Sequence, residues 1–253
     1  MIGVLDSGVG GLCALKTLRR LCPEEDLVYL ADTAHLPYGE HARGDICRYT
    51  ARALCFFLSE GVDRVLLACG TASALALDFC RHSFPFPVFG VLTPAVLAAA
   101  RATVSRRIGV VATRASISCG AYERLLHRYA PSANIFSCPA PDLVSLAEAG
   151  DGDLEKIYKV IGASLCPLRE AGIDTLVLGC THFSLLKEGF SAFFPGVKLI
   201  DAATIAAEDL VSTYFPRHER GRLRLYATQD EQHLALRANA VLGERVRAKR
   251  ILI

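Results

Sequence analysis

Short apolar runs alternate along the chain with longer segments in which leucines recur at helical spacing. The first run, Ile2 to Leu5, leads through a glycine-rich turn into a segment from Leu12 to Leu21 whose leucines fall on one helical face. A second apolar run, Leu27 to Ala31, follows. This order of strand, turn, helix and strand continues to the end of the chain, and it predicts an α/β fold with mainly parallel sheets.

The later elements follow from the same two patterns, because short apolar runs indicate strands and three- to four-residue spacing indicates helices. The expected strands lie at 64–68, 88–91, 108–113, 134–137, 175–178, 198–200 and 223–226. The expected helices lie at 45–60, 71–81, 94–103, 122–129 and 154–171, with two more beginning near 203 and 230.

The same plan starts a second time at Ile108. Its Ile-Gly-Val sequence repeats that of Ile2, and each copy leads at a similar distance to a cysteine that ends an apolar run, first Cys69 and then Cys180. Such self-similarity predicts two pseudo-symmetric, flavodoxin-like lobes. We expect residues 1–92 and 205–253 in the first lobe, to which the tail returns, and residues 93–204 in the second.

Polar residues that can carry chemistry follow these two cysteines. Thr71 comes shortly after Cys69, while Thr181 and His182 come directly after Cys180. Ligands of open α/β sheets bind at the carboxyl ends of strands, so both thiols are expected in one active site between the lobes. The alternative is structural, because a free cysteine usually behaves as a small buried hydrophobe and the chain has ten. The position of these two where an apolar run stops favours function.

The composition is that of a globular protein of 253 residues, with 52% hydrophobic and 21% charged residues and a net charge of +2. This small charge does not favour nucleic acid or an acidic membrane as a partner. The basic stretches 217–224 and 244–250 contain acids and leucines, as a solvated surface does. No apolar run approaches the roughly 18 residues of a membrane span, and Met1 leads directly into an apolar run with no basic leader. A cytoplasmic location is therefore expected.

The cysteine spacing argues against a metal site. No two of the ten have the Cys-x-x-Cys spacing of zinc or thioredoxin-type sites. Cys180 and His182 could supply half of a metal site, but no second close pair of ligands is evident. We therefore expect no metal and no other cofactor.

The turn Asp6-Ser-Gly-Val-Gly-Gly11 invites a dinucleotide-binding interpretation, because it follows a strand and Asp32 ends the next one. However, Cys13 occupies the third glycine position of that fingerprint, and Asp6 would place a negative charge beside the pyrophosphate. Binding of an ammonium group through Asp6 agrees better with the composition of this turn.

An amino acid is a ligand that these residues could bind. The helix N-terminal amides after Gly39, Thr71 and Thr181 could bind its carboxylates, helped by neighbouring hydroxyls. Asp6 could bind its ammonium group. Two facing thiols could then remove a carbon-bound proton and return one to the opposite face, as inversion requires. Because a free thiol is only a few per cent ionised at neutral pH, His182 or a helix N-terminus must activate it.

Five motifs are informative when they are considered together: Asp6-Ser-Gly-Val-Gly-Gly11, Pro37-Tyr-Gly39, Ala68-Cys-Gly-Thr-Ala-Ser73, Ile108-Gly-Val-Val-Ala-Thr113 and Leu178-Gly-Cys-Thr-His182. In order and spacing they resemble the motifs of the cofactor-independent glutamate racemases. The likeness runs from about Ile2 to Asp201. Each motif alone is weak, but the combination is highly specific.

The resemblance implies a two-lobed α/β isomerase that interconverts L- and D-glutamate for peptidoglycan synthesis. A homodimer is the oligomeric state that we expect to test. The resemblance also implies Cys69 and Cys180 as the acid/base residues, with Asp6 assisting Cys69. His182 and Glu148 would assist Cys180. The residues implied at the glutamate site are Asp6, Ser7, Pro37, Tyr38, Gly39, Gly70, Thr71, Ser116, Thr181 and His182. Of these, Ser116 stands where the family usually has threonine, which preserves the hydroxyl.

One position departs from the family pattern, which has asparagine after the first cysteine where this chain has Gly70. Loss of one hydrogen-bonding partner from a dry site costs about 1–3 kcal/mol. A water in the vacated volume would recover part of that loss. We therefore expect a glutamate racemase with a raised KM that Gly70→Asn lowers, unless Gly70 adopts a backbone conformation that asparagine tolerates less well. The alternatives are a racemase of another acidic amino acid such as aspartate, and a catalytically weak homologue that acts as a binding protein.

Overall fold

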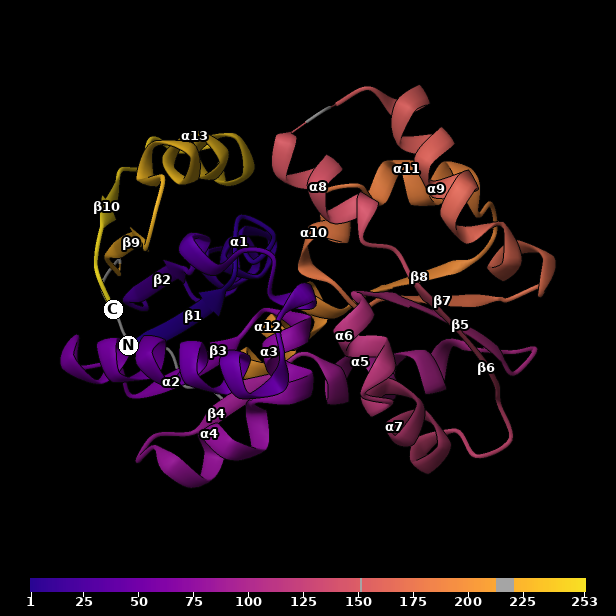
Figure 1. Ribbon diagram of the computed structural model, residues 1–253, viewed down its shortest axis with the longest axis horizontal. Coiled ribbons are helices and arrows are strands. Elements are labelled where there is room, and N and C mark those ends of the chain that lie inside the picture. Colours follow the sequence, from indigo (N-terminus) through magenta and orange to yellow (C-terminus); the bar gives the residue numbers. More distant parts are fainter. Residues whose placement is uncertain (151, 213–220) are drawn as a thin grey trace.

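Two parallel β-sheets with helices around them form the protein, whose structure is a computed structural model that describes residues 1–150, 152–212 and 221–253 (Figure 1). Each strand pairing recorded in either sheet is parallel. The predicted α/β class with mainly parallel sheets is therefore confirmed.

The first sheet has six strands in the order β10-β9-β2-β1-β3-β4. These strands are β1 (Ile2–Asp6), β2 (Leu27–Ala31), β3 (Arg64–Leu67), β4 (Val88–Gly90), β9 (Leu223–Ala227) and β10 (Ala248–Arg250). The two strands β1 and β2 are buried along their whole length, because helices cover both faces of the sheet, and they therefore consist almost entirely of apolar residues. Strand β9 pairs with β2, so the tail returns to this sheet as expected.

The second sheet has four strands in the order β6-β5-β7-β8. These strands are β5 (Arg107–Ala112), β6 (Asn134–Pro139), β7 (Thr175–Leu178) and β8 (Lys198–Asp201). Their order matches β2-β1-β3-β4 of the first sheet, which is the pseudo-symmetry that the repeated Ile-Gly-Val sequence predicts. Consequently Cys69 and Cys180 follow equivalent strands, β3 and β7. The proposed division of the chain at 92/93 and 204/205 stays a prediction.

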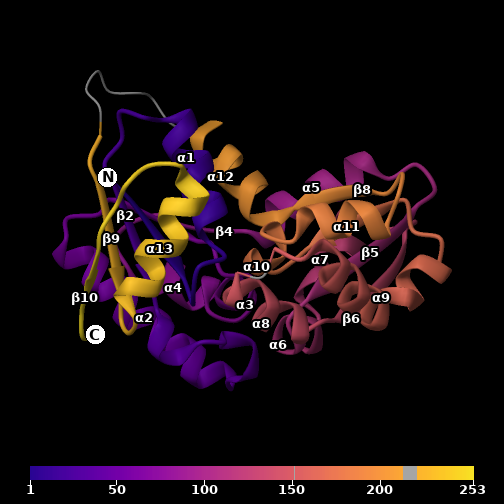
Figure 2. The ribbon, with the colours of Figure 1, turned by 90° about the horizontal axis from the view of Figure 1, so that it is seen from above.

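The helices up to β4 are α1 (Leu12–Leu21), η1 (Thr33–His35), η2 (Tyr38–Glu40), α2 (Arg43–Ser59), α3 (Gly70–Leu75) and α4 (Leu77–Ser83). The later ones are α5 (Leu92–Ala102), α6 (Arg114–Ser118), α7 (Ala121–Tyr129), α8 (Asp142–Ala149), α9 (Leu154–Glu170), α10 (Thr181–Ser184), α11 (Lys187–Phe193), α12 (Ala202–Ser212) and α13 (Glu231–Leu242). Helix α12 packs against both α1 and α5, so it joins the two halves of the molecule (Figure 2).

The differences from the sequence expectation concern short elements. The helix expected at 71–81 is two helices, α3 and α4, separated at Ala76, whose φ of −116° departs from the value of about −63° that a regular helix has. The spacing of apolar residues along the sequence does not reveal a helix break at a single residue. Strand β10 was not predicted because Lys249 and Arg250 are charged and exposed, as is common in edge strands. Helices α6, α8 and α11 were also not predicted. Of the basic stretch 217–224, residues 217–220 lie outside the described residues.

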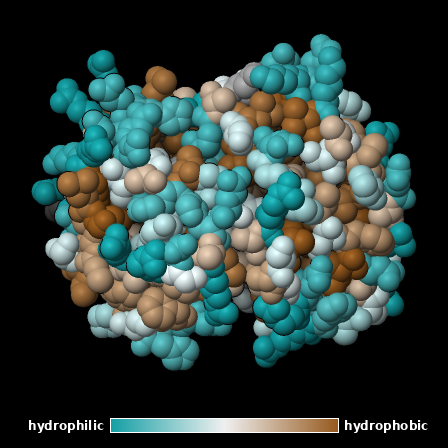
Figure 3. All heavy atoms as spheres, in the orientation of Figure 1, coloured by the Kyte–Doolittle hydropathy of each residue, from teal (hydrophilic) through white to brown (hydrophobic). Residues whose placement is uncertain are grey.

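The largest buried apolar cluster spans both sheets. It contains Ile2 and Leu66 from the first sheet and Ile108 and Val177 from the second. This shared core fixes how the two halves are placed against each other. Hydrophilic residues cover much of the outer face (Figure 3). Across the three described ranges, no helix has the length and apolar character that a membrane span requires.

Candidate active site

The two cysteine turns meet at the boundary between the sheets. Cys69 and Cys180 are buried, with 4% and 6% of their surface exposed. A Cβ atom added to Gly70 would overlap the carbonyl oxygen of Gly179 and lie 3.7 Å from the Cys180 Cα. The structure therefore brings together the two strand ends that the sequence singles out.

Cys180 is paired with a histidine and a carboxylate. His182 Nδ1 lies 3.5 Å from Cys180 Sγ, and His182 Nε2 lies 2.5 Å from Glu148 Oε1. The same Glu148 oxygen accepts the Val9 N–H at 3.0 Å from the loop after β1. A thiol, an imidazole and a carboxylate in a row can move a proton to and from the thiol.

The histidine and the carboxylate are both charged near neutral pH. Burial alone would lower the pKa of His182, but hydrogen bonds and charges of Cys180 and Glu148 outweigh it and hold that pKa well above 6.5. Burial alone would raise the pKa of Glu148, but His182 and the Val9 N–H outweigh it and hold that pKa below 4.5. Each group thus stabilises the charged form of the other.

This pair makes the stability of the protein depend on pH. Because the folded pKa of Glu148 lies below its ordinary value of 4.5, the contribution of Glu148 is complete above pH 4.5 and is lost as the pH falls through the folded value. We expect wild type to melt a few degrees above Glu148→Gln at pH 7, since about 1 kcal/mol corresponds to roughly 2–4 °C at this size. Melting curves between pH 3 and pH 7 should show the difference shrinking at the acid end. A difference that stays constant would mean that the ionised carboxylate does not contribute.

Cys69 has different surroundings. Its Sγ lies 3.9 Å from Ser7 Oγ, and burial, together with the negative charge of Asp6, raises the pKa of Cys69 to about 12. Asp6 is itself fully buried, and burial raises its pKa. It accepts the Gly8 N–H at 2.9 Å and the Thr181 hydroxyl at 2.9 Å. The second of these bonds crosses from one half of the molecule to the other. Cys69 therefore holds its proton at neutral pH.

A cluster of three hydroxyl groups lies where α3 and α6 begin. Thr113 Oγ1 is 2.9 Å from Thr71 Oγ1 and 2.9 Å from Ser116 Oγ. All three residues are buried. Hydroxyls grouped in this way can donate hydrogen bonds to a carboxylate. The sequence reasoning missed Thr113, although its place directly after β5, equivalent to the end of β1, could have identified it.

The loop from Pro37 to Gly39 closes one side of this cluster. A Cβ on Gly39 would lie 2.6 Å from Thr113 Cβ, so the loop backbone packs directly on the second half. Tyr38 is buried and donates its hydroxyl to Asp32 Oδ2 at 2.6 Å. Asp32 also accepts the Thr228 hydroxyl at 2.8 Å. The Tyr38 hydroxyl is therefore held by Asp32, and the backbone of the loop is what faces Thr113.

The free space expected beside Gly70 is not present. The Gly179 carbonyl oxygen occupies the place toward which a side chain at position 70 would point. Gly70 is not among the glycines with a positive φ, so its torsion angles do not require glycine. The expectation of a vacated volume is therefore wrong, because the backbone of the opposite half fills it.

The glycine turn after β1 also packs against the opposite half. A Cβ on Gly8 would overlap Glu148 Oε1, and one on Gly10 would lie 2.5 Å from Thr181 Oγ1. These glycines allow close approach of two backbones instead of making room for a pyrophosphate, which disfavours the dinucleotide interpretation. In the described part of the chain, no three His, Cys, Asp or Glu side chains are grouped as metal ligands.

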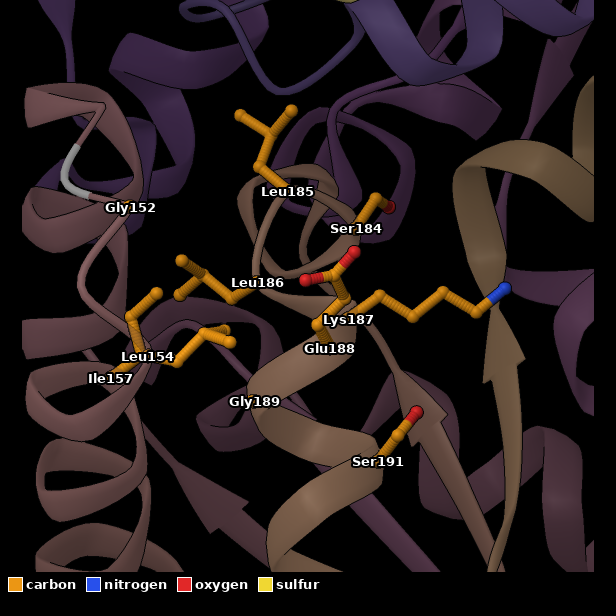
Figure 4. A pocket seen from close by; sticks show the side chains of 10 residues that line it. All are labelled: Gly152, Leu154, Ile157, Ser184, Leu185, Leu186, Lys187, Glu188, Gly189 and Ser191. Carbon is orange, nitrogen blue, oxygen red and sulfur yellow. The ribbon is translucent and has the colours of Figure 1, made fainter.

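A surface pocket of about 630 Å³ lies apart from this site, between α9 and the α10–α11 segment (Figure 4). Leu154, Ile157 and Leu186 form its apolar side, and the Lys187 side chain extends away from them. None of the predicted site residues lines this pocket. The predicted cysteines instead lie at the boundary between the two sheets, where their turns meet.

Comparisons with known proteins identify racemases as relatives of this chain. The family model of Asp/Glu/Hydantoin racemases matches residues 13–210. The chain is 41% identical over 250 residues to a glutamate racemase of Aquifex aeolicus, covering 98% of this chain and 96% of that protein. It is 36% identical over 251 residues to a glutamate racemase of Levilactobacillus brevis, covering 96% of this chain and 91% of that protein.

Solved structures of glutamate racemases are also similar to this chain. Glutamate racemase isoform RacE1 from Bacillus anthracis superposes with a TM-score of 0.95 at 28% identity, covering 99% of this chain and 97% of that one. Glutamate racemase from Francisella tularensis in complex with D-glutamate superposes with a TM-score of 0.89 at 30% identity, covering 99% and 96%. An aspartate racemase from Picrophilus torridus is 17% identical with a TM-score of 0.61, a likeness of fold alone.

Proposed function

The chain belongs to the Asp/Glu/hydantoin racemase family, and we propose that it is an isomerase that interconverts L- and D-glutamate without a cofactor. One observation carries the assignment of the chemistry to Cys69 and Cys180. Their turns follow equivalent strands of the two sheets and abut each other, so the thiols can act on one bound carbon from two sides.

The two thiols have the protonation partners that a two-base reaction needs. One thiolate removes the α-proton, and the opposite thiol donates its own proton to the other face of the planar intermediate. His182, with Glu148 behind it, exchanges a proton with Cys180. Asp6, close to Cys69, is the group that can accept its proton when Cys69 acts as the base. The reverse reaction uses the same groups in exchanged roles.

The remaining polar groups suit the three charges of glutamate. The hydroxyls of Thr71, Thr113 and Ser116 can donate to a carboxylate, as can Ser7 on the Cys69 side. The Asp6 carboxylate can accept from the ammonium group, and it already binds Thr181 of the opposite half. Since these groups now bond to one another, glutamate must replace some of these hydrogen bonds when it binds.

An aspartate racemase and a binding protein without turnover are less well supported. Relatives at 33–41% identity over nearly the whole chain carry the name glutamate racemase, whereas the aspartate racemase is similar in fold alone. The two cysteines, Asp6 and His182 are buried together and Glu148 is largely buried beside them, an arrangement that a pure binding site would not need.

We expect purified protein to racemise glutamate with no added cofactor. Circular dichroism on D-glutamate and on L-glutamate measures the reaction in both directions. In deuterated water the product enantiomer should carry deuterium at the α-carbon, because the donating thiol exchanges with solvent. Aspartate is the matched control substrate, since it is shorter by one methylene and should turn over at least tenfold more slowly. Equal turnover of both, or product without deuterium, would contradict this assignment.

We further propose that the enzyme acts in the cytoplasm, supplies D-glutamate for peptidoglycan and assembles as a homodimer. The ten cysteines are free in the structure, as the reducing cytoplasm would keep them. Rescue of a D-glutamate auxotroph tests the cellular role.

Light scattering across a concentration series tests the assembly, with a constant monomer mass as the opposing outcome.

A further inference from the structure

The C-terminal helix α13 touches the helix that carries Glu148. His233 Nε2 lies 3.5 Å from Glu148 Oε2, and Arg237 Nη2 donates to the Ala147 carbonyl at 3.3 Å. In the ribbon, α13 lies above the first sheet and α8 lies beside the second, with their ends facing each other (Figure 1). The contact therefore joins an element of one half to an element of the other.

The end of α8 is shaped for this contact. Gly150 ends the helix in a left-handed conformation with φ of 71°, and a Cβ there would overlap Arg237 Nη1. A guanidinium at this place meets the negative end of the α8 dipole. Arg237 thus holds the last turn of α8, which contains Glu148.

Both carboxylate oxygens of Glu148 are engaged. Oε1 accepts from His182 Nε2 and from the Val9 N–H, while Oε2 faces His233. The side chain of Glu148 is only 15% exposed, and that of His233 is 32% exposed. One carboxylate consequently connects the imidazole beside Cys180 to α13.

We infer that His233 is a positioning residue for the Cys180 half of the reaction, which fixes Oε2 of Glu148 and thereby the orientation of His182. This inference rests on the proposed function. His233 does not reach the thiols itself, so its effect passes through Glu148. When His233 is protonated, its charge also favours the ionised form of Glu148, in the direction that lowers the pKa of that carboxyl.

Other charges act on Glu148 as well. His182 on α10 lowers its pKa through a hydrogen bond and through charge, and the Val9 N–H lowers it further. Asp6 is a like charge in the same site. Arg237 on α13 lies against the end of α8. The charge of Glu148 is one of the causes that raise the pKa of Tyr29 on β2. Removal of His233 should therefore shift the titration of Glu148 upward without abolishing its ionisation.

The test compares His233→Ala and His233→Gln with wild type, using glutamate racemisation between pH 3 and pH 9, because the folded pKa of Glu148 lies below 4.5. We expect His233→Ala to lower kcat about tenfold with little change in KM, since a misplaced proton-transfer group slows the chemical step. Its acid limb should move to higher pH, because the charge of His233 is one of the causes that lower the pKa of Glu148. Gln can place a neutral N–H donor near Oε2, so His233→Gln should recover most of kcat near neutral pH and keep the shifted limb.

Leu236→Ala is the matched control, because Leu236 is on the same helix and 67% exposed. It should behave as wild type. If wild type racemises glutamate and His233→Ala keeps its kcat and its pH profile, the inference is overturned while the proposed function stands. The inference is equally overturned if Leu236→Ala loses as much activity as His233→Ala. If His233→Ala melts below the assay temperature, the profile of His233→Gln decides alone. Failure of wild type to racemise glutamate would instead refute the proposed function.

Discussion

Replacing Cys69 or Cys180 by serine should lower racemisation of glutamate by at least about 10³-fold in either variant. A serine hydroxyl is a far weaker acid than a thiol, and a positioned acid or base contributes roughly 10²–10⁴-fold. Because the equilibrium constant between mirror-image substrates is unity, kcat/KM must fall equally in both directions. Circular dichroism of each variant on L- and on D-glutamate measures this loss.

The chain offers a matched control for these variants. Cys80 is as buried as Cys69 and Cys180, and burial raises its pKa to about 12 as it does that of Cys69, but Cys80 lies in α4. Cys80→Ser should keep near-normal kcat/KM per folded molecule. If Cys69→Ser or Cys180→Ser retained a tenth of wild-type activity, that cysteine would not be one of the two acid/base groups.

Gly70→Asn should lower kcat/KM for glutamate by about 100-fold, the opposite of the effect that the sequence alone predicts. Its Cβ would overlap the Gly179 carbonyl, which is backbone and cannot rotate away, so the two cysteine turns must move apart. A displacement of about 1 Å at a reacting centre costs on the order of 10²-fold. Steady-state kinetics with glutamate and a melting curve measure the two consequences separately.

Gly70→Ala separates the causes, because it adds the Cβ without a carboxamide. If contact with Gly179 dominates, both variants lose activity to a similar extent. If asparagine restores what alanine loses, the carboxamide binds glutamate and the steric account is wrong. Gly44→Ala is the control for a glycine with nothing near its Cβ position, and it should leave kinetics unchanged.

Local patterns in the sequence predicted most of the strands and the two cysteines. Residues 2–5 and 176–178 are continuous apolar runs because both faces of a parallel sheet are covered, and such runs are visible without a structure. The strand-end positions of Cys69 and Cys180 followed directly. The matching order of the two sheets then made their meeting expected.

Contacts between distant segments could not be predicted in this way. The approach of Gly179 to Gly70 depends on how two separately formed turns are placed, and no spacing along the chain records it. The hydrogen bond from the Val9 N–H to Glu148 and the hydrogen bond between Thr71 and Thr113 also join distant segments, so the sequence did not predict them. Glu148 was identified from a family motif, whereas its contact with His233 belongs to a helix more than eighty residues later.

The return of the tail also sets the order in which the two sheets can be completed. The four strands of the second sheet lie between Arg107 and Asp201, whereas the first sheet must wait for β9, which pairs with β2 from near the start of the chain. Pairings between segments so far apart form slowly, because a long loop must close first. Until Leu223–Ala227 emerges during synthesis, β2 is an apolar edge strand with unpaired backbone groups, open to pairing with another chain. Pairing with β9 therefore closes this edge of β2 only after the tail has been synthesised.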